Sequence, residues 1–302
     1  MAADGFLNLL KPPGMTSHDM VSVVRARLGV TRVGHLGTLD PAAAGLLPIA
    51  VGRATRLFRF AGMWDKAYRA EVAFGVTTDT LDAEGQVVEV SDSRALTETT
   101  LAALLADLEG EMEQAPPAFS AARVGGRRLH ELARRGEPRE GRPKRVWIEK
   151  LELVDFVPGR QARALIDVVC STGTYVRVLA ADLGRRAGCC AYLAFLVRTR
   201  VGRFELSDSL TLEELEAACG KGEEQASLLT ADWPLVDLPA VELGARSARA
   251  FAQGTSVQTD APPGWPVKAY GPGRSFLGLG EIVVEGQMRP RVVLAGEGSP
   301  EA

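Results

Sequence analysis

The amino-acid sequence predicts an α+β protein built from two unequal parts. Helix-like and strand-like segments interleave irregularly up to about residue 236, which favours α+β over a doubly wound sheet. After Trp233-Pro234 the chain becomes rich in glycine, with short alternating runs typical of a β domain of about 55 residues. The 302 residues are 46% hydrophobic, which is enough for a substantial core. We expect one domain over residues 1–236 and a separable one over 237–302.

Strands are predicted where short runs are apolar or alternate between apolar and polar residues. In 67–74, for example, Tyr68 and every second residue after it can bury one face of a strand. In order, the predicted strands are 5–10, 67–74, 86–90, 145–156 and 162–170, followed by 266–270, 276–284 and 288–294.

Helices are predicted mainly from their ends. Thr16 or Ser17 can begin a helix that Gly29 ends, and Thr211 with Glu214 forms a capping box. In order, the predicted helices are 16–28, 97–108, one ending at 187, one beginning after 211, and 247–252.

Charge is separated along the chain, although the net charge is only −3. Residues 118–148 contain nine Lys and Arg against three acids, whereas 65–114 contain twelve acids against three bases. A second basic segment, 21–64, contains six arginines. Two basic clusters in a chain that is slightly acidic overall indicate a face that binds RNA or DNA. A solvated surface is the alternative for either cluster alone.

Asp40 is the only acid between Val21 and Trp64. Two interpretations stand side by side. Asp40 can be the N-cap of a short buried helix, with Pro41 at the first helical position. It can also be a catalytic carboxylate held in a basic loop against a bound polyanion. The two are compatible, because a cap fixes where a carboxylate points.

Other chemistries leave no pattern in the sequence. The four cysteines form no CxxC pair and there are only three histidines, so we expect reduced thiols and no metal site. There is no phosphate-binding glycine loop, so we expect no nucleotide cofactor. No apolar run approaches the ~20 residues of a membrane span and no signal-peptide pattern is present, so we expect a cytoplasmic protein that does not bind membranes.

Four segments occur together in a fixed order. They are 11–19 (KPPGMTSHD), 34–56 with GTLDP at 37–41, 116–121 (PPAFSA) and 171–177 (STGTYVR). Together they closely resemble the TruB family, the bacterial tRNA pseudouridine synthases that act on the uridine at tRNA position 55. The resemblance covers about residues 5–204. Residues 237–302 resemble, more weakly, a PUA domain, a small RNA-binding β pseudo-barrel.

The resemblance implies a mixed, largely antiparallel sheet core with flanking helices, and roles for particular residues. Asp40 would be the nucleophile and Arg177 its partner. Tyr68 would stack on the flipped uracil, Tyr175 would be a second active-site tyrosine, and Leu196 would be an apolar wall. The substrate-binding residues would include His35, which enters the space left by the flipped base, and Lys11, Arg127, Arg128 and Arg134. Residues 118–146 would be the insertion that clamps the RNA.

Two positions depart from the family pattern, because Arg123 and His130 stand where a lysine and a tyrosine are expected.

The implied reaction cleaves the N1–C1′ bond of uridine, turns the base and rejoins it through C5. A carboxylate nucleophile suits this, because it can form a bond and leave again. No second acid lies beside Asp40 in the sequence, which fits an isomerisation that excludes water.

We expect the T-arm of tRNA as the partner, a monomer, and no cofactor. Two alternatives stay open. The protein could act chiefly as an RNA-binding factor that helps tRNA fold, or it could be a related synthase with another RNA target.

Overall fold

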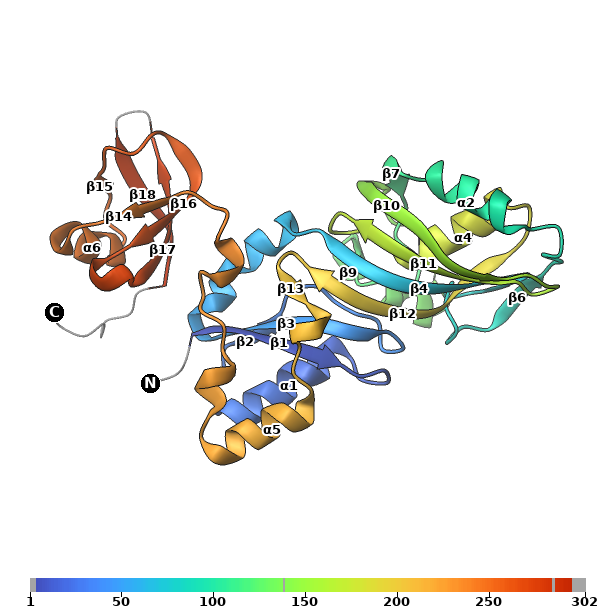
Figure 1. The fold of residues 1–302 in the computed structure, drawn as a ribbon, viewed down its shortest axis with the longest axis horizontal. Helices are drawn as coiled ribbons and strands as arrows, with labels where there is room; N and C mark the ends of the chain where they lie inside the picture. The colour runs from blue at the N-terminus through green and yellow to red at the C-terminus, as the bar shows by residue number, and fades with distance from the viewer. Residues whose placement is uncertain (1–3, 138, 284–285, 295–302) are drawn as a thin grey trace.

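The computed structural model describes residues 4–137, 139–283 and 286–294. A nine-stranded mixed sheet forms the core of the first part (Figure 1). Its strands are β1 (Gly5–Lys11), β2 (Val33–His35), β3 (Ala44–Val51), β4 (Lys66–Phe74), β7 (Gly110–Gln114), β10 (Lys144–Val157), β11 (Arg163–Cys170), β12 (Ala191–Val201) and β13 (Phe204–Glu205). The main order is β1-β3-β12-β4-β11-β10-β7, in which only the β3–β12 pair is parallel. The predicted α+β class is confirmed.

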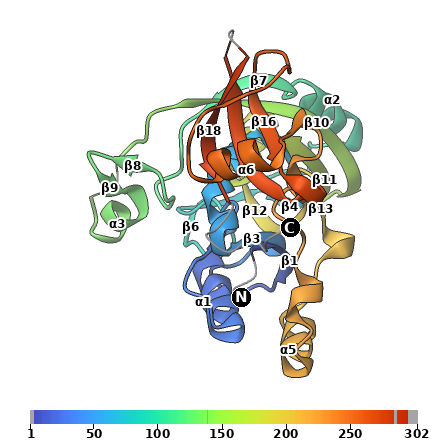
Figure 2. The same ribbon diagram turned by 90° about the vertical axis from the view of Figure 1, so that its left-hand side faces the viewer.

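Two short hairpins leave this sheet. One consists of β5 (Val76–Thr78) and β6 (Val87–Val90), and the other of β8 (Arg123–Val124) and β9 (Arg127–Arg128). The second hairpin and the helix that follows it, α3 (Leu129–Arg134), project away from the sheet (Figure 2). They carry four of the nine Lys and Arg residues of 118–148, which are Arg123, Arg127, Arg128 and Arg134.

Helices cover the sheet in two groups. Helices α2 (Glu98–Ala106) and α4 (Val176–Arg186) pack with β4, β10, β11 and β12 around one core. Helices α1 (Ser17–Leu28) and α5 (Leu212–Lys221) pack with β1 and β3 around another. Thr16 caps α1 in a capping box, and Gly29 ends it in the left-handed conformation. The capping box predicted for α5 is also present.

A five-stranded curled sheet forms the second part. Its strands are β14 (Ala240–Glu242), β15 (Val257–Gln258), β16 (Gly264–Tyr270), β17 (Phe276–Ile282) and β18 (Gln287–Val293), with helix α6 (Ala245–Ala252) beside them. Three of these strands and the helix match the sequence predictions. The predicted end of the strand 276–284, Val284, lies outside the described residues.

The two parts share a hydrophobic cluster. Phe6 and Phe204 of the large sheet belong to the same buried cluster as Leu279 and Val292 of the small one. Arg59, in the 3-10 helix η1 (Gly52–Met63), also donates a hydrogen bond to the Arg291 carbonyl at 2.8 Å. The small sheet is therefore packed against the large one and is more than an appended module.

The helix considered at Asp40-Pro41 is wrong. Residues 41–42 form a turn, and Ala44–Val51 form strand β3. Leu46 and the residues after it are fully buried, since β3 lies between β1 and β12. Gly45 passes so close to β12 that a Cβ on it would lie 2.4 Å from the Arg198 carbonyl oxygen. The long apolar run therefore forms a central strand, and the turn leaves Asp40 at its edge.

No helix among the described residues combines the length and the apolar character needed to cross a membrane.

Candidate active site

Five residues singled out from the sequence line one pocket. Asp40 comes from the turn before β3, Tyr68 from β4 and Leu196 from β12, while Tyr175 and Arg177 come from the start of α4. The sheet order brings them together, because β4 lies between β11 and β12. Tyr68 stands opposite Arg198 and two residues before Ala70, which stands opposite Leu196, so these side chains share a face.

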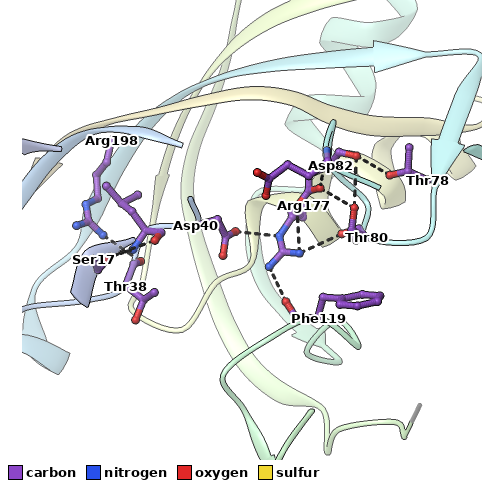
Figure 3. A network of polar contacts seen from close by, with 11 residues as sticks. Ser17, Thr38, Asp40, Thr78, Thr80, Asp82, Phe119, Arg177 and Arg198 are labelled. Atoms are coloured by element: carbon purple, nitrogen blue, oxygen red, sulfur yellow. Dashed lines mark hydrogen bonds and ion pairs between the residues drawn. The ribbon is translucent and has the colours of Figure 1, made fainter. Parts of the chain in front are cut away.

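Arg177 lies behind Asp40 and ties it to the protein (Figure 3). Its Nε lies 3.0 Å from Asp40 Oδ2, and its Nη1 lies 3.3 Å from Asp82 Oδ2. The guanidinium also donates to the carbonyls of Thr80 and Phe119, each at 3.0 Å. The Arg177 side chain is 6% exposed, against 40% for Asp40. The carboxylate therefore faces the pocket while the arginine is buried beneath it.

Asp82 was missed by the sequence analysis: no second acid lies beside Asp40 in the sequence, but the fold brings Asp82 to the same arginine. Asp82 lies 42 positions later, in the turn between β5 and β6, and shares Arg177 with Asp40. Thr80 Oγ1 donates to its carboxylate at 2.6 Å and the Glu84 amide at 3.1 Å. Neighbouring Leu81 has a φ of +63°, a costly conformation for this residue. The turn is thus shaped around Asp82.

The pKa of Asp40 is raised above its ordinary value. Burial is the main cause, the Arg177 guanidinium opposes it, and the negative charge of Asp82 adds to it. Arg177 sits at the N-terminus of α4, where the helix dipole disfavours a cation. Two carboxylates and two carbonyls offset that cost, so the cation is held for a purpose other than helix stability.

The turn that carries Asp40 is fixed from the side away from the pocket. Fully buried Arg198 donates to the carbonyls of Leu46 at 2.8 Å, Gly37 at 3.2 Å and Thr38 at 3.4 Å. Ser17 Oγ pairs with Leu39 through both its amide (2.9 Å) and its carbonyl (3.1 Å). These contacts leave the Asp40 backbone little freedom, so they fix where its carboxylate lies relative to the pocket.

Lys11 does not have the geometry of a substrate-binding residue. Its side chain is fully buried, and its ammonium donates to the carbonyls of Met15 (2.6 Å), Pro12 (2.9 Å) and Pro41 (3.1 Å). Those three bonds use all three N–H groups. Lys11 therefore joins β1 to the Asp40 turn, a positioning role in place of the substrate contact expected from the sequence.

The two tyrosines are held differently. Tyr68 is 7% exposed, and burial raises its pKa to about 12, so the hydroxyl stays protonated. The Tyr175 amide donates to Gln114 Oε1 of β7 at 2.9 Å. With Leu196, the two rings give the pocket a largely apolar wall suited to a planar base.

His35 and the three arginines of the insertion lie outside this lining. His35 is in β2, and burial lowers its pKa, with a further effect from Arg198. Arg127, Arg128 and Arg134 are exposed on β9 and α3 (Figure 2). Ser120 and Ala121 line the pocket and lead directly into that hairpin. A ligand in the pocket would therefore reach the basic surface.

Lys66 also lines the pocket, and the sequence analysis did not single it out. Its position two residues before Tyr68 on β4 was the available signal, because alternate strand residues share a face. Among residues 4–137, 139–283 and 286–294, no group of three or more His, Cys, Asp or Glu side chains is placed to hold a metal ion.

Three segments of the chain match known families. Residues 25–176 match the N-terminal domain of TruB family pseudouridylate synthase. Residues 177–232 match the C-terminal domain of tRNA pseudouridylate synthase B, and 239–294 match the C-terminal family of pseudouridine synthase II TruB.

Curated relatives agree with these matches. The chain is 53% identical to tRNA pseudouridine synthase B of Symbiobacterium thermophilum over 84% of this chain and 83% of the relative. It is 42% identical to the tRNA pseudouridine synthase B of Gloeothece citriformis, over 96% of this chain and 97% of the relative.

Among solved structures, a chain of a Cbf5-Nop10-Gar1 complex matches with a TM-score of 0.70 and 25% identity, covering 93% of this chain and 79% of that one. A chain of an archaeal box H/ACA sRNP Nop10-Cbf5 complex matches in fold, with a TM-score of 0.72 and 22% identity, covering 96% and 85%.

Proposed function

This chain belongs to the TruB family of pseudouridylate synthases, and we propose that it isomerises the uridine at position 55, in the T-loop of tRNA. The activity on tRNA follows from relatives that share its sequence over most of their length. One observation supports the chemistry above all. A single half-exposed carboxylate, Asp40, faces a pocket with one wall of two tyrosines and Leu196, while a buried arginine fixes the carboxylate from behind.

Asp40 acts as the nucleophile in this proposal. It attacks the bound nucleotide, at the sugar or at the base, as the N1–C1′ bond breaks, and it leaves again when C5 bonds to C1′. N1 gains a proton and C5 loses one, so the product is an isomer of the substrate. Arg177 favours the ionised form of Asp40 against the effect of burial, and it orients the attacking oxygen.

Tyr68, Tyr175 and Leu196 bind the base by stacking and apolar contact. A uridine in a folded loop has to leave the stack to reach Asp40, at a cost of a few kcal/mol. We propose that His35 occupies the space which the base leaves, and that Arg127, Arg128 and Arg134 contact the T-arm backbone. Their exposure on a projecting hairpin supports this, since phosphate contacts position RNA without reading its sequence.

The same proposal includes the division of the chain. Residues 1–236 would be the catalytic domain and 237–302 the PUA-like domain, whose curled sheet would contribute RNA affinity. We propose that the chain acts as a monomer. Action on tRNA supports a cytoplasmic site.

The test is release of tritium from C5-labelled uridine in a tRNA transcript. We expect stoichiometric release by the wild-type protein, and none from a transcript in which the position-55 uridine is replaced by cytidine. Tight binding of both transcripts without release would instead support an RNA-binding factor. Release from the substituted transcript would move the target elsewhere.

A further inference from the structure

Lys66 lines the pocket and is held by a single side-chain hydrogen bond. It is half-buried at the start of β4, on the same face as Tyr68, and lines the pocket that contains Asp40. Its ammonium donates to Thr172 Oγ1 at 2.7 Å, in the exposed loop before α4. On the other side, a Cβ built on Gly37 would lie 3.2 Å from Lys66 Nζ. The ammonium therefore lies between the Asp40 turn and the α4 loop.

The charge of Lys66 is not balanced by the protein. Among residues 4–137, 139–283 and 286–294, no carboxylate lies within ion-pair distance of its ammonium, and one hydrogen bond accounts for one of its three N–H groups. Burial, with a smaller effect from the nearby cation Arg198, lowers the pKa of Lys66 to about 8. Buried charges are ordinarily paired. Arg177, in the same pocket, has two carboxylates.

Lys66 and Arg198 thus place two cations around Gly37, but only Arg198 has protein acceptors for most of its N–H groups. Arg198 gives its N–H groups to three carbonyls, so it acts on the protein itself. The remaining donors of Lys66 have no such use. A group that lies at the rim of the pocket and carries an unmatched positive charge is suited to an anion that arrives with the substrate.

The geometry points to Lys66 as the residue that binds a phosphate adjoining the flipped uridine. This inference rests on the proposed function, in which the base enters the pocket. The base fills the apolar interior, so the ribose and its two phosphates lie at the rim, where the Lys66 ammonium is. Lys66 then anchors the extruded nucleotide, and Thr172 holds the ammonium in place. Phosphate binding also removes the cost of an unpaired, partly buried cation.

A cycle between protein and RNA tests this assignment. The RNA is a T-arm hairpin in which one phosphate beside the target uridine, 5′ or 3′, is replaced by an uncharged methylphosphonate. The variant is Lys66→Met, and the matched control is Lys150→Met, which removes an exposed lysine paired with Glu152 on β10. Dissociation constants are measured by fluorescence anisotropy, and tritium release is measured on the same RNAs.

We expect Lys66→Met to weaken binding about 10-fold or more, the usual effect of losing a hydrogen bond to a charged group. One of the two neutral linkages should weaken binding by the wild-type protein as much as Lys66→Met weakens binding to the unmodified RNA. Combining that linkage with Lys66→Met should weaken binding no further. Lys66→Arg should retain most of the affinity, and Lys150→Met should behave as wild type with either linkage. If the loss of affinity from Lys66→Met multiplied with the loss from the neutral linkage at both positions, the assignment would be overturned.

A second measurement needs no variant, so it stands even if Lys66→Met does not fold. A lysine of pKa about 8 is about nine-tenths protonated at pH 7 and about one-quarter at pH 8.5, so the wild-type dissociation constant should rise about fourfold. This rise in the dissociation constant should be absent for the RNA in which the phosphate that Lys66 contacts is replaced by the neutral methylphosphonate. Equal rises with charged and neutral linkages would contradict the inference.

The other groups that face Lys66 do not titrate in that range. The pKa values of Cys170 and Tyr68 are raised to about 11 and 12, and the Arg198 guanidinium is not deprotonated in a protein. Lys11 has a pKa of about 8 but is fully buried on three carbonyls, so its effect is the same for both linkages.

Tritium release separates the two proposals. A wild-type protein that binds the hairpin without releasing tritium contradicts the proposed function, and the binding cycle still decides the role of Lys66. A wild-type protein that does not bind the hairpin contradicts both.

Discussion

Replacing Asp82 with asparagine removes one of the two negative charges on Arg177 and nearly preserves the shape of the side chain. Asp82 Oδ2 lies 3.3 Å from Arg177 Nη1, which also donates to the Thr80 carbonyl. Arg177 keeps Asp40 and both carbonyls, so the cation is not left unpaired. The charged component of one hydrogen bond is lost, which we place at about 1 to 2 kcal/mol of folding free energy. For a chain of this size, in which unfolding entropy is about 2.1 cal/mol/K per residue, the melting temperature should fall by about 2 to 3 °C.

The same change should move the pH dependence of the reaction. Only ionised Asp40 is nucleophilic, so activity is lost as pH falls through its pKa. Asp82 raises that pKa and Arg177 lowers it. Asp82→Asn removes the repulsion and leaves Arg177 to Asp40 alone, so the pKa falls and the acid limb moves to lower pH. The plateau rate should drop about 10- to 100-fold, since a less restrained Arg177 and a less basic carboxylate cost about 1.4 to 2.7 kcal/mol in the barrier.

The assay is tritium release under single-turnover conditions with saturating tRNA, followed across the acid limb. Glu152→Gln is the control, because it removes a carboxylate from an exposed pair with Lys150 that contributes little. An acid limb that moves to higher pH would refute the electrostatic reasoning. A wild-type plateau and an unchanged limb, in a protein that melts normally, would show that Asp82 is not coupled to Asp40.

Three further predictions concern other parts of the molecule. Asp40→Asn should abolish tritium release while tRNA affinity stays within a few fold, because the amide keeps the shape but not the nucleophilicity; turnover by a variant shown undeamidated by mass spectrometry would contradict this. Neutralising the three arginines of the projecting hairpin and α3 should flatten the salt dependence of tRNA binding, by up to about one log–log unit per lost phosphate contact, with much less effect on the saturated rate. These residues are Arg127, Arg128 and Arg134. Deletion after Leu238 should lower the melting temperature as well as the affinity, because the shared cluster loses Leu279 and Val292; melting at the wild-type temperature would show that the small sheet contributes nothing to that core.

Much of the fold could be predicted because local rules and tertiary packing agree. Alternation in 67–74 predicted β4, since one face of that strand meets the core while the other is partly open. The caps of α1 and α5 were visible because side chains at those positions satisfy backbone groups within the same few residues. Such signals need no knowledge of the rest of the chain.

The missed features depend on distant segments. Strand β12 pairs with β4 across two register shifts, at Leu193/Phe195 and at Arg198/Arg200, so its sequence lacks the clean alternation that would have revealed it. Asp82 lies in an acid-rich segment, where no sequence pattern separates it from its neighbours. Lys11 looked available for RNA because nothing in the sequence shows that three carbonyls from two segments surround it.

The turn at Asp40 explains why the helix considered there would serve the reaction poorly. An N-cap aspartate accepts hydrogen bonds from backbone amides of the first helical turn through its carboxylate, which lowers its nucleophilicity and turns it toward the backbone. Here the turn is closed by the backbone instead, because the Ala43 amide donates to the Asp40 carbonyl at 3.1 Å. The carboxylate is thereby available to Arg177 and to the pocket. Because β3 begins directly after this turn, pairing with β1 and β12 fixes the position of Asp40.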